Sequence, residues 1–320
     1  MKKLLTAHTK NLYLSSSLAL IFLHKFCCCK LDGKFQVVTE MPPSNHQPRR
    51  LLFAALCVAA LLTCVATLLV GLAPVRDRLT SASSATSRRM SGFPRVILWA
   101  WERPERLDFI NPQETGVAFL ARTIYLRGDA AVTRPRLQPL RVPHGTTLIA
   151  VARIESDKSQ PPQLSAVQRA QAVASIAELI NRNGVRAIQI DFDAVASERA
   201  FYRELLFDLR RLMPDAMPLS ITALASWCIH DRWLDDLPVD EAVPMLFRMG
   251  ADERQVGHYL DGGEDFRAPI CRGSYGVSTD ESVSRRLAPT RRFYLFHTRS
   301  WSSTSMHQTI ERFLHVQQDS

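Results

Sequence analysis

A strand, a helix and a second strand follow one another between residues 184 and 224, and this pattern constrains the fold more than any other part of the chain. Gly184 precedes a β-branched run, Val185 to Phe192, which is typical of a buried strand. Apolar residues at helical spacing follow, with Ser197 as the expected N-cap and Pro214 as the expected end. A further strand is expected from Leu219 to Leu224. Such strand–helix–strand units build parallel sheets.

Eight candidate strands recur in this region of the chain, several of them separated by helical patterns. We expect them at residues 95–100, 117–125, 147–154, 185–192, 219–224, 242–248, 275–277 and 293–297. The clearest helix is expected from an N-cap at Ser165 to Ile180, and a last helix is expected around Met306 to Val316. Eight strands alternating with helices predict an α/β fold of the (β/α)₈ TIM-barrel type rather than an open, doubly wound sheet. Little helix is expected after the first, second and seventh strands, so we expect an irregular barrel.

The N-terminal part of the chain has a different composition from the rest. Residues 51–75 carry no charge, and a helix of about 25 residues spans roughly 37 Å, which predicts a transmembrane signal anchor rather than a buried core helix. Residues 1–50 form a tail before this anchor, residues 76–92 a flexible linker rich in Ser, Thr, Ala and Arg, and residues 93–320 the barrel. The polar lead that opens at Met41 favours translation starting there, over a lipidated or metal-binding, cysteine-rich extension through residues 1–40.

Charge and cysteine content bear on location and partners. The formal net charge of +9 comes largely from the tail, the juxtamembrane segment and scattered arginines, with no aromatic-interleaved basic stripe, so no nucleic-acid partner is indicated. Arginines flank both ends of the span, but long C-terminal domains cross membranes largely regardless of charge. We therefore expect a lipid bilayer as one partner and the barrel on the outer side of the membrane. In that compartment Cys228 and Cys271 could form a disulfide, whereas in the cytosol both would be small buried thiols.

Acidic and aromatic residues gather where the expected strands end. Asp191 and Asp193 are two residues apart, so strand alternation places both on one side, and Glu155 ends the preceding strand. These three are the candidate catalytic residues, with a structural ion pair as the alternative role for the two aspartates. The candidate substrate-binding residues are Trp99, Trp101, Glu102, Trp227, Met245, Phe247, Arg248 and Tyr275. Aromatic rings stack on sugars and paired carboxylates hydrolyse glycosidic bonds, so a carbohydrate polymer is the expected partner.

Motifs for other chemistries are absent from the sequence. There is no Gly-x-Gly-x-x-Gly, no phosphate-binding Gly-Lys-Ser/Thr, no His-Glu-x-x-His and no Cys-x-x-Cys, so we predict neither a cofactor nor a metal. Three functions stay open at this point: a glycoside hydrolase, a catalytically inactive glycan-binding barrel, and a structural component of an envelope assembly.

The segment around the two aspartates resembles the fourth-strand signature of family 18 glycoside hydrolases, Asp-x-x-Asp-x-Asp-x-Glu. Asp191 matches that signature, Asp193 stands at the glutamate position, and Arg186 and Gln189 replace the leading aspartates. The resemblance implies a chitinase-like barrel in which Asp193 is the general acid and Asp191 orients an acetamido group of the substrate as nucleophile. Glu155 is the alternative acid.

A second resemblance covers more of the chain, from residue 93 to about 299. It is carried by residues 219–228, 237–249 and 271–281, which resemble a bacterial family of membrane-attached, barrel-type proteins. Met245 and Phe247, within the second of these runs, also resemble the sixth-strand methionine and aromatic residue of chitinase-like barrels. The second resemblance implies a barrel attached to a bacterial inner membrane, with the barrel domain in the periplasm, and it implies no particular reaction.

Overall fold

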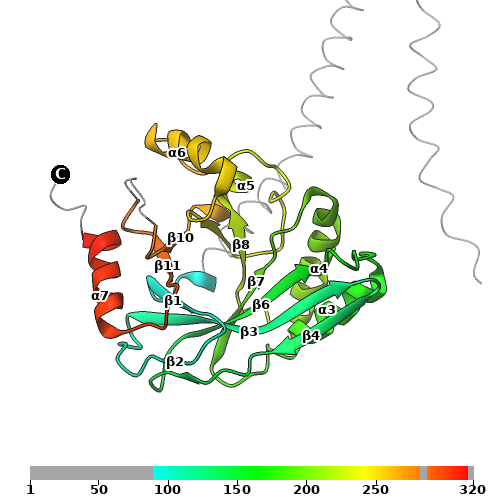
Figure 1. Cartoon of the computed structure of the whole chain (residues 1–320), viewed down its shortest axis with the longest axis horizontal. Helices are drawn as coiled ribbons and strands as arrows, with labels where there is room; N and C mark the ends of the chain where they lie inside the picture. Colours follow the sequence, from blue (N-terminus) through cyan, green and yellow to red (C-terminus); the bar gives the residue numbers. More distant parts are fainter. Residues whose placement is uncertain (1–88, 282–286, 316–320) are drawn as a thin grey trace, which may run out of the picture. The chain divides into compact units, whose positions relative to one another are not determined.

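The computed structural model describes residues 89–281 and 287–315, and it contains a closed barrel of eight parallel strands (Figure 1). The first strand of the ring, β1, pairs with the next strand of the ring, β3, and with the last, β11, and this pairing closes the barrel. The barrel strands are, in order around the ring, β1 (Val96–Ala100), β3 (Thr115–Arg127), β6 (Leu148–Ser156), β7 (Val185–Asp191), β8 (Leu219–Leu224), β9 (Glu241–Met245), β10 (Ser274–Ser278) and β11 (Arg292–Phe296). Every strand expected from the sequence is present, with its ends displaced by three residues at most. The TIM-type fold is confirmed.

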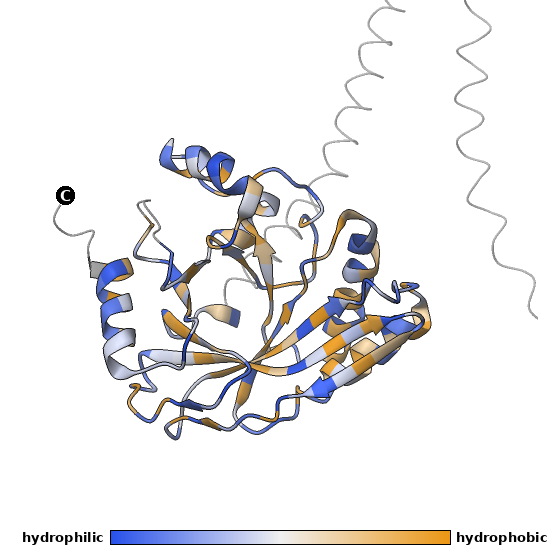
Figure 2. Cartoon of the chain, viewed as in Figure 1, coloured by the Kyte–Doolittle hydropathy of each residue, from blue (hydrophilic) through white to orange (hydrophobic). Residues whose placement is uncertain are grey.

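The outer layer is irregular, as the sequence indicated. Helices follow five strands: α3 (Ala166–Ala177), α4 (Arg199–Leu212), α5 (Ala225–Ile229), α6 (Glu253–Asp261) and α7 (Ser303–Ile310). Short helical turns are η1 (Ala196–Glu198), η2 (Gly250–Asp252), η3 (Pro269–Cys271) and η4 (Glu311–His315). After β1 and β3 the chain forms only the short strands β2 (Glu105–Arg106), β4 (Ala130–Pro135) and β5 (Leu140–Arg141). Strand β4 pairs antiparallel with β3, and Figure 2 shows hydrophobic and hydrophilic residues alternating along this hairpin.

The helix caps show where local sequence sufficed and where it did not. Ser165 caps α3, and its hydroxyl accepts a hydrogen bond from the backbone N–H of Gln168 at 3.1 Å. The expected cap at Ser197 is wrong, because that residue lies within η1. Glu198 bonds this turn instead, accepting from the backbone N–H of Val195 at 2.8 Å. A carboxylate can satisfy a free N–H at a helix start as a serine hydroxyl would.

Two apolar layers stabilise the barrel. One lies between the strands and the outer helices, and the other fills the barrel interior with side chains from alternate strand positions. The interior layer includes Ile97, Trp99, Ala118, Ile149, Val151, Ala187, Val243 and Tyr294. At its base Glu241 accepts hydrogen bonds from Tyr294 and Arg292, both at 2.6 Å. Buried charge is thereby paired at the end of the barrel where the strands begin.

The segment before β1 belongs to the barrel rather than to a linker. Met90 and Phe93 are buried in the interior layer. Arg89 forms an ion pair with Asp240 at 2.7 Å, and Arg292 donates to the carbonyl of Met90 at 2.7 Å. The domain therefore begins no later than Arg89, four residues before the boundary expected from composition.

The remaining N-terminal expectations concern residues outside the described part of the chain. These are the tail, the span over residues 51–75 and the linker up to residue 88. In residues 89–281 and 287–315, no helix has both the length and the apolar character needed to cross a membrane.

The two barrel cysteines form a disulfide. Cys228 in α5 is joined to Cys271 in η3, with their Cα atoms 5.9 Å apart and both side chains fully buried. The bridge ties the connection after β8 to the segment that leads into β10. The predicted pairing is confirmed, and the loops do reach across β9.

Candidate active site

A cleft of about 230 Å³ opens among residues at the C-terminal ends of the barrel strands. Its lining comes chiefly from β1, β6, β7, β8, β9 and β11 and the segments that follow them. The lining residues are Trp99, Trp101, Arg153, Asp191, Asp193, Thr222, Leu224, Ala225, Ser226, Met245, Phe247, Arg248, Met249, Asp252 and Phe296. This is the end of the barrel at which (β/α)₈ enzymes keep their active sites.

Two aspartates lie on one wall of this cleft. Asp191 is the last residue of β7, is almost fully buried and accepts a hydrogen bond from the Thr222 hydroxyl at 2.7 Å. Asp193 lies two residues further on and is exposed within the cleft. Phe192, between them, points to the opposite side, where it is buried against Tyr202 with ring centroids 5.2 Å apart. The alternation expected from the sequence is confirmed.

Both carboxyl groups hold their protons more tightly than an exposed aspartate. Burial raises the pKa of Asp191 to about 6, an effect opposed by the Thr222 hydrogen bond and reinforced by the charge of Asp193. Burial also raises the pKa of Asp193, while the charge of Arg153 lowers it. A carboxyl group that is protonated near neutral pH can act as a general acid.

Arg153 links the third and fourth barrel strands electrostatically. Its Nε lies 2.6 Å from Oε1 of Glu155 and 4.0 Å from Oδ2 of Asp191, and its guanidinium lies 5.5 Å from the ring centroid of Trp101. Glu155 is thus one strand away from the aspartates, as expected, but it does not line the cleft. The guanidinium partly neutralises both Glu155 and Asp191.

Aromatic rings form the rest of the cleft wall. Phe247 and Phe296 stack with centroids 5.4 Å apart and planes 8° apart. Trp99 meets Phe247 edge-on at 6.3 Å, and Trp101 meets Phe296 in the same way at 6.3 Å. The guanidinium of Arg248 lies 5.3 Å from the Phe296 ring centroid. A continuous aromatic surface of this kind suits the apolar face of a sugar ring.

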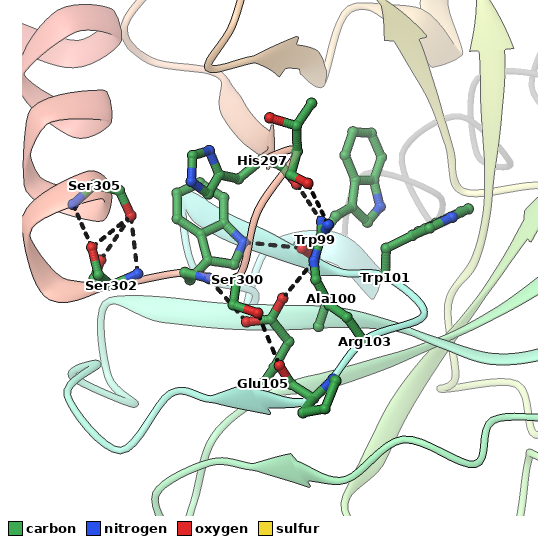
Figure 3. A network of polar contacts seen from close by, with 12 residues as sticks. Trp99, Ala100, Trp101, Arg103, Glu105, His297, Ser300, Ser302 and Ser305 are labelled. Atoms are coloured by element: carbon green, nitrogen blue, oxygen red, sulfur yellow. Dashed lines mark hydrogen bonds and ion pairs between the residues drawn. The ribbon is translucent and has the colours of Figure 1, made fainter.

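A buried carboxylate fixes the loops that carry these rings (Figure 3). Glu105 is 1% exposed and accepts hydrogen bonds from the backbone N–H of Trp301 at 3.0 Å and from Nε of Arg103 at 3.1 Å. Arg103 also donates to the carbonyl of His297, and the Trp301 indole donates to the carbonyl of Trp99 at 3.0 Å. The segments after β1 and β11 are therefore held together next to the cleft.

Three of the predicted substrate-binding residues lie outside the cleft. Trp227 is buried in α5, where its ring packs edge-on against Trp233 at 4.9 Å, because the helix starts directly after β8 and turns this side chain away. Tyr275 is absent from the cleft lining because Gly276, the next residue of β10, is the one that faces Trp99. These two positions correct the expected site.

Glu102 is the third predicted substrate-binding residue that lies outside the cleft. Its carboxylate forms an ion pair with Arg134 of the β3–β4 hairpin, and it is not part of the cleft lining. The pairing could not be foreseen, because Arg134 comes from an antiparallel strand added outside the barrel ring.

Several lining residues were not among the sequence candidates. Three of them, Thr222, Arg153 and Phe296, lie near the ends of their strands and point into the barrel. In each strand the residue two positions earlier also points into the barrel. Strand alternation would have found them once the inward phase of each strand was known. Asp252, in η2, carried no such signal. Within the described residues, no group of three or more His, Cys, Asp or Glu side chains is arranged to hold a metal ion.

Comparison with known proteins gives a family match and a structural likeness. Residues 144–243 match the model of a family described as a domain of unknown function, DUF3142. This segment contains Asp191, Asp193 and Thr222, whereas the aromatic wall lies outside it. No curated protein matches the chain. The structure is similar to the catalytic domain of a family GH18 chitinase from the fern Peteris ryukyuensis, with 15% identity and a TM-score of 0.41 over 68% of this chain and 95% of that chain.

Proposed function

We propose that this chain is a membrane-anchored, glycoside-hydrolase-like protein that acts on a cell-envelope or secreted polysaccharide by carboxylate acid/base catalysis. One observation carries the proposal: Asp191 and Asp193, with raised pKa values, line the same cleft as a wall of aromatic rings. Aromatic rings can stack on a sugar, and cleavage of a glycosidic bond needs one carboxyl group that donates a proton and a second that directs the attack on the sugar carbon.

The geometry suggests a role for each group. In this proposal Asp193, which is exposed in the cleft, protonates the leaving glycosidic oxygen. Asp191, which is more buried and bonded to Thr222, orients the substrate group that attacks the sugar carbon, and Arg153 balances the charge of the pair. A water molecule then completes hydrolysis, with Asp193 returning as general base.

The proposed location rests on two features. An uncharged segment of about 25 residues is long enough to span a bilayer. The disulfide between Cys228 and Cys271 is of the kind that persists in oxidising compartments. We infer a bacterial inner-membrane anchor with the barrel in the periplasm.

A glycan-binding barrel without turnover is the second candidate. It is favoured by Asp193 itself, because aspartate is one methylene shorter than the glutamate expected at this position of the signature. A small misplacement of a reacting group can cost a large factor in rate. In that case the aromatic wall would hold the sugar and the carboxylates would only contribute to binding.

The test is a panel of polysaccharides assayed for binding and for release of reducing ends in parallel. Asp193→Asn should abolish release and retain both the fold and the binding. The matched control is Asp236→Asn, which makes the same chemical change at an exposed turn position outside the cleft and should retain both activities. Full activity in Asp193→Asn would reject the assignment and make Glu155 the candidate acid. Wild-type binding with no release from any polysaccharide would support the second candidate.

A further inference from the structure

The cleft contains one arginine whose positive charge is not paired. Arg248 follows strand β9, its side chain is exposed, and it belongs to the cleft lining. Arg153, the other arginine of the lining, forms an ion pair with Glu155 at 2.6 Å, whereas the guanidinium of Arg248 forms none with any carboxylate in the part of the chain that the structure describes. A guanidinium carries five N–H donors and no acceptor, so an exposed one in a cleft can bind an anionic group of a ligand.

The backbone and a neighbouring ring hold this guanidinium at the cleft. Arg248 has a φ of 52°, in the left-handed region that residues other than glycine rarely adopt. Its backbone N–H donates to Oε2 of Glu281 at 3.0 Å, and its guanidinium lies 5.3 Å from the ring centroid of Phe296. Strained conformations of this kind are concentrated at active sites and ligand-binding sites.

A second guanidinium lies against the same aromatic wall. That of Arg153 is 5.5 Å from the ring centroid of Trp101, and Trp101 meets Phe296 edge-on at 6.3 Å. Two neighbouring rings therefore each carry an arginine, and of these two only Arg248 lacks an ion pair. A sugar that packs against the rings has its substituents around its rim, where a guanidinium beside a ring can bind an anionic one.

Two carboxylates near Arg248 oppose the binding of an anion. Asp252 also lines the cleft, four residues further along the chain. The pKa of Asp280 is lowered by a hydrogen bond from the Ser278 hydroxyl and, to a smaller extent, by the charge of Arg248. Because neither carboxylate forms an ion pair with the guanidinium, they weaken its attraction for an anion without occupying its donors.

We propose that Arg248 makes the cleft specific for an acidic polysaccharide, whose sugars carry a carboxylate or sulfate group, by binding that group beside the Phe296 ring. Such a group presents two oxygens to the planar fork of the guanidinium. The inference rests on the proposed function in taking a polysaccharide as the ligand, and it applies equally to a sugar that is cleaved and to one that is only bound.

The test compares polymers that differ in charge, with the full-length protein. Polygalacturonate and alginate are each compared with their carboxyl-reduced forms, and dextran sulfate with dextran, by calorimetric titration at one ionic strength. The wild type should bind at least one acidic polymer more tightly than its neutral form, and the pair that shows this preference distinguishes carboxylate from sulfate. Arg248→Gln should lower the ratio of the two affinities by about tenfold, because a charge-assisted pair is lost.

Two further variants separate charge from geometry. Arg248→Lys keeps the charge without the planar fork, so its affinity ratio should lie between those of the wild type and Arg248→Gln. Asp252→Asn removes an opposing charge from the cleft, so the ratio should rise, and a fall in this variant would overturn the proposal.

The matched control is an arginine outside the cleft, because a protein with a formal net charge of +9 also attracts acidic polymers nonspecifically. Arg186 is exposed on β7, lies 5.9 Å from the ring centroid of Phe93 and is not part of the cleft lining. Arg186→Gln should leave the affinity ratio unchanged. An equal fall in Arg186→Gln and Arg248→Gln, a wild-type ratio in Arg248→Gln, or no preference of the wild type for any acidic polymer would overturn the proposal.

Binding and cleavage are read separately in this design. Release of reducing ends from a neutral polymer, together with no preference for an acidic one, would reject the acidic specificity and leave the glycosidase proposal standing. An Arg248-dependent preference without release from any polymer would count against hydrolysis and support the acidic specificity.

Discussion

The free energy of unfolding of the wild-type protein should fall as pH rises from about 4 to about 6, because Asp191 loses its proton in this range. Replacement of Asp191 by asparagine should abolish this fall. The pKa of Asp191 is raised from its ordinary value of 3.8 to about 6 by burial. The folded state therefore binds this proton more tightly than the unfolded state does, so stability is highest below pH 3.8, falls as pH rises and levels off above pH 6. Each pKa unit corresponds to about 1.4 kcal/mol, which gives a loss of about 3 kcal/mol.

Asparagine keeps the shape of the side chain and an oxygen that can accept the Thr222 hydrogen bond, but it does not titrate. The free energy of unfolding of Asp191→Asn minus that of wild type should thus rise by about 2.4 kcal/mol between pH 4 and pH 7. Urea titrations followed by tryptophan fluorescence at several pH values give this difference, and the other carboxyl groups largely cancel from it. A difference that is constant across this range would refute the assignment of a raised pKa to Asp191.

Three further variants test the scaffold. Changing both Cys228 and Cys271 to serine should lower the free energy of unfolding by about 3–4 kcal/mol, measured by denaturant titration against the oxidised wild type, and equal stabilities would contradict a bridge across 43 residues. Met90→Ala should cost about 2–5 kcal/mol because it opens a void at the base of the barrel, and a loss below 1 kcal/mol would show that this segment does not close the base. Gly276→Ala places a methyl group 3.0 Å from the Trp99 ring and should cost about 1–3 kcal/mol with a change in tryptophan fluorescence; an unchanged spectrum would refute the close approach.

The number of strands and their order were readable from the sequence because most of the strands are apolar runs separated by turn or helix signals. The segment from Val185 to Asp191 is the clearest case, since its buried pattern and the two carboxylates at its end depend only on alternation. The Ser165 cap was equally local. The disulfide could be proposed because only two cysteines lie in the barrel region, although their distance could not be known.

Which residues line the site depends on which alternate set of side chains in each strand points toward the barrel axis. Local sequence does not determine this. Strand β10 offers Tyr275 and Gly276 to opposite sides, and only the contact of Gly276 with Trp99 decides which one faces inward. Trp227 lies outside the expected site because α5 begins immediately after β8 and turns its side chain away from the cleft.

The sequence by itself determined that this chain forms a barrel of parallel strands with two carboxylates at the end of the fourth, because periodicity and strand ends are properties of neighbouring residues. Only the tertiary structure decided what surrounds those carboxylates. Thr222 on the next strand and the aromatic wall are brought to the pair by closure of the ring. The pKa of a carboxyl group is set by burial and by charges within a few ångströms, and those neighbours come from residues far apart in the chain.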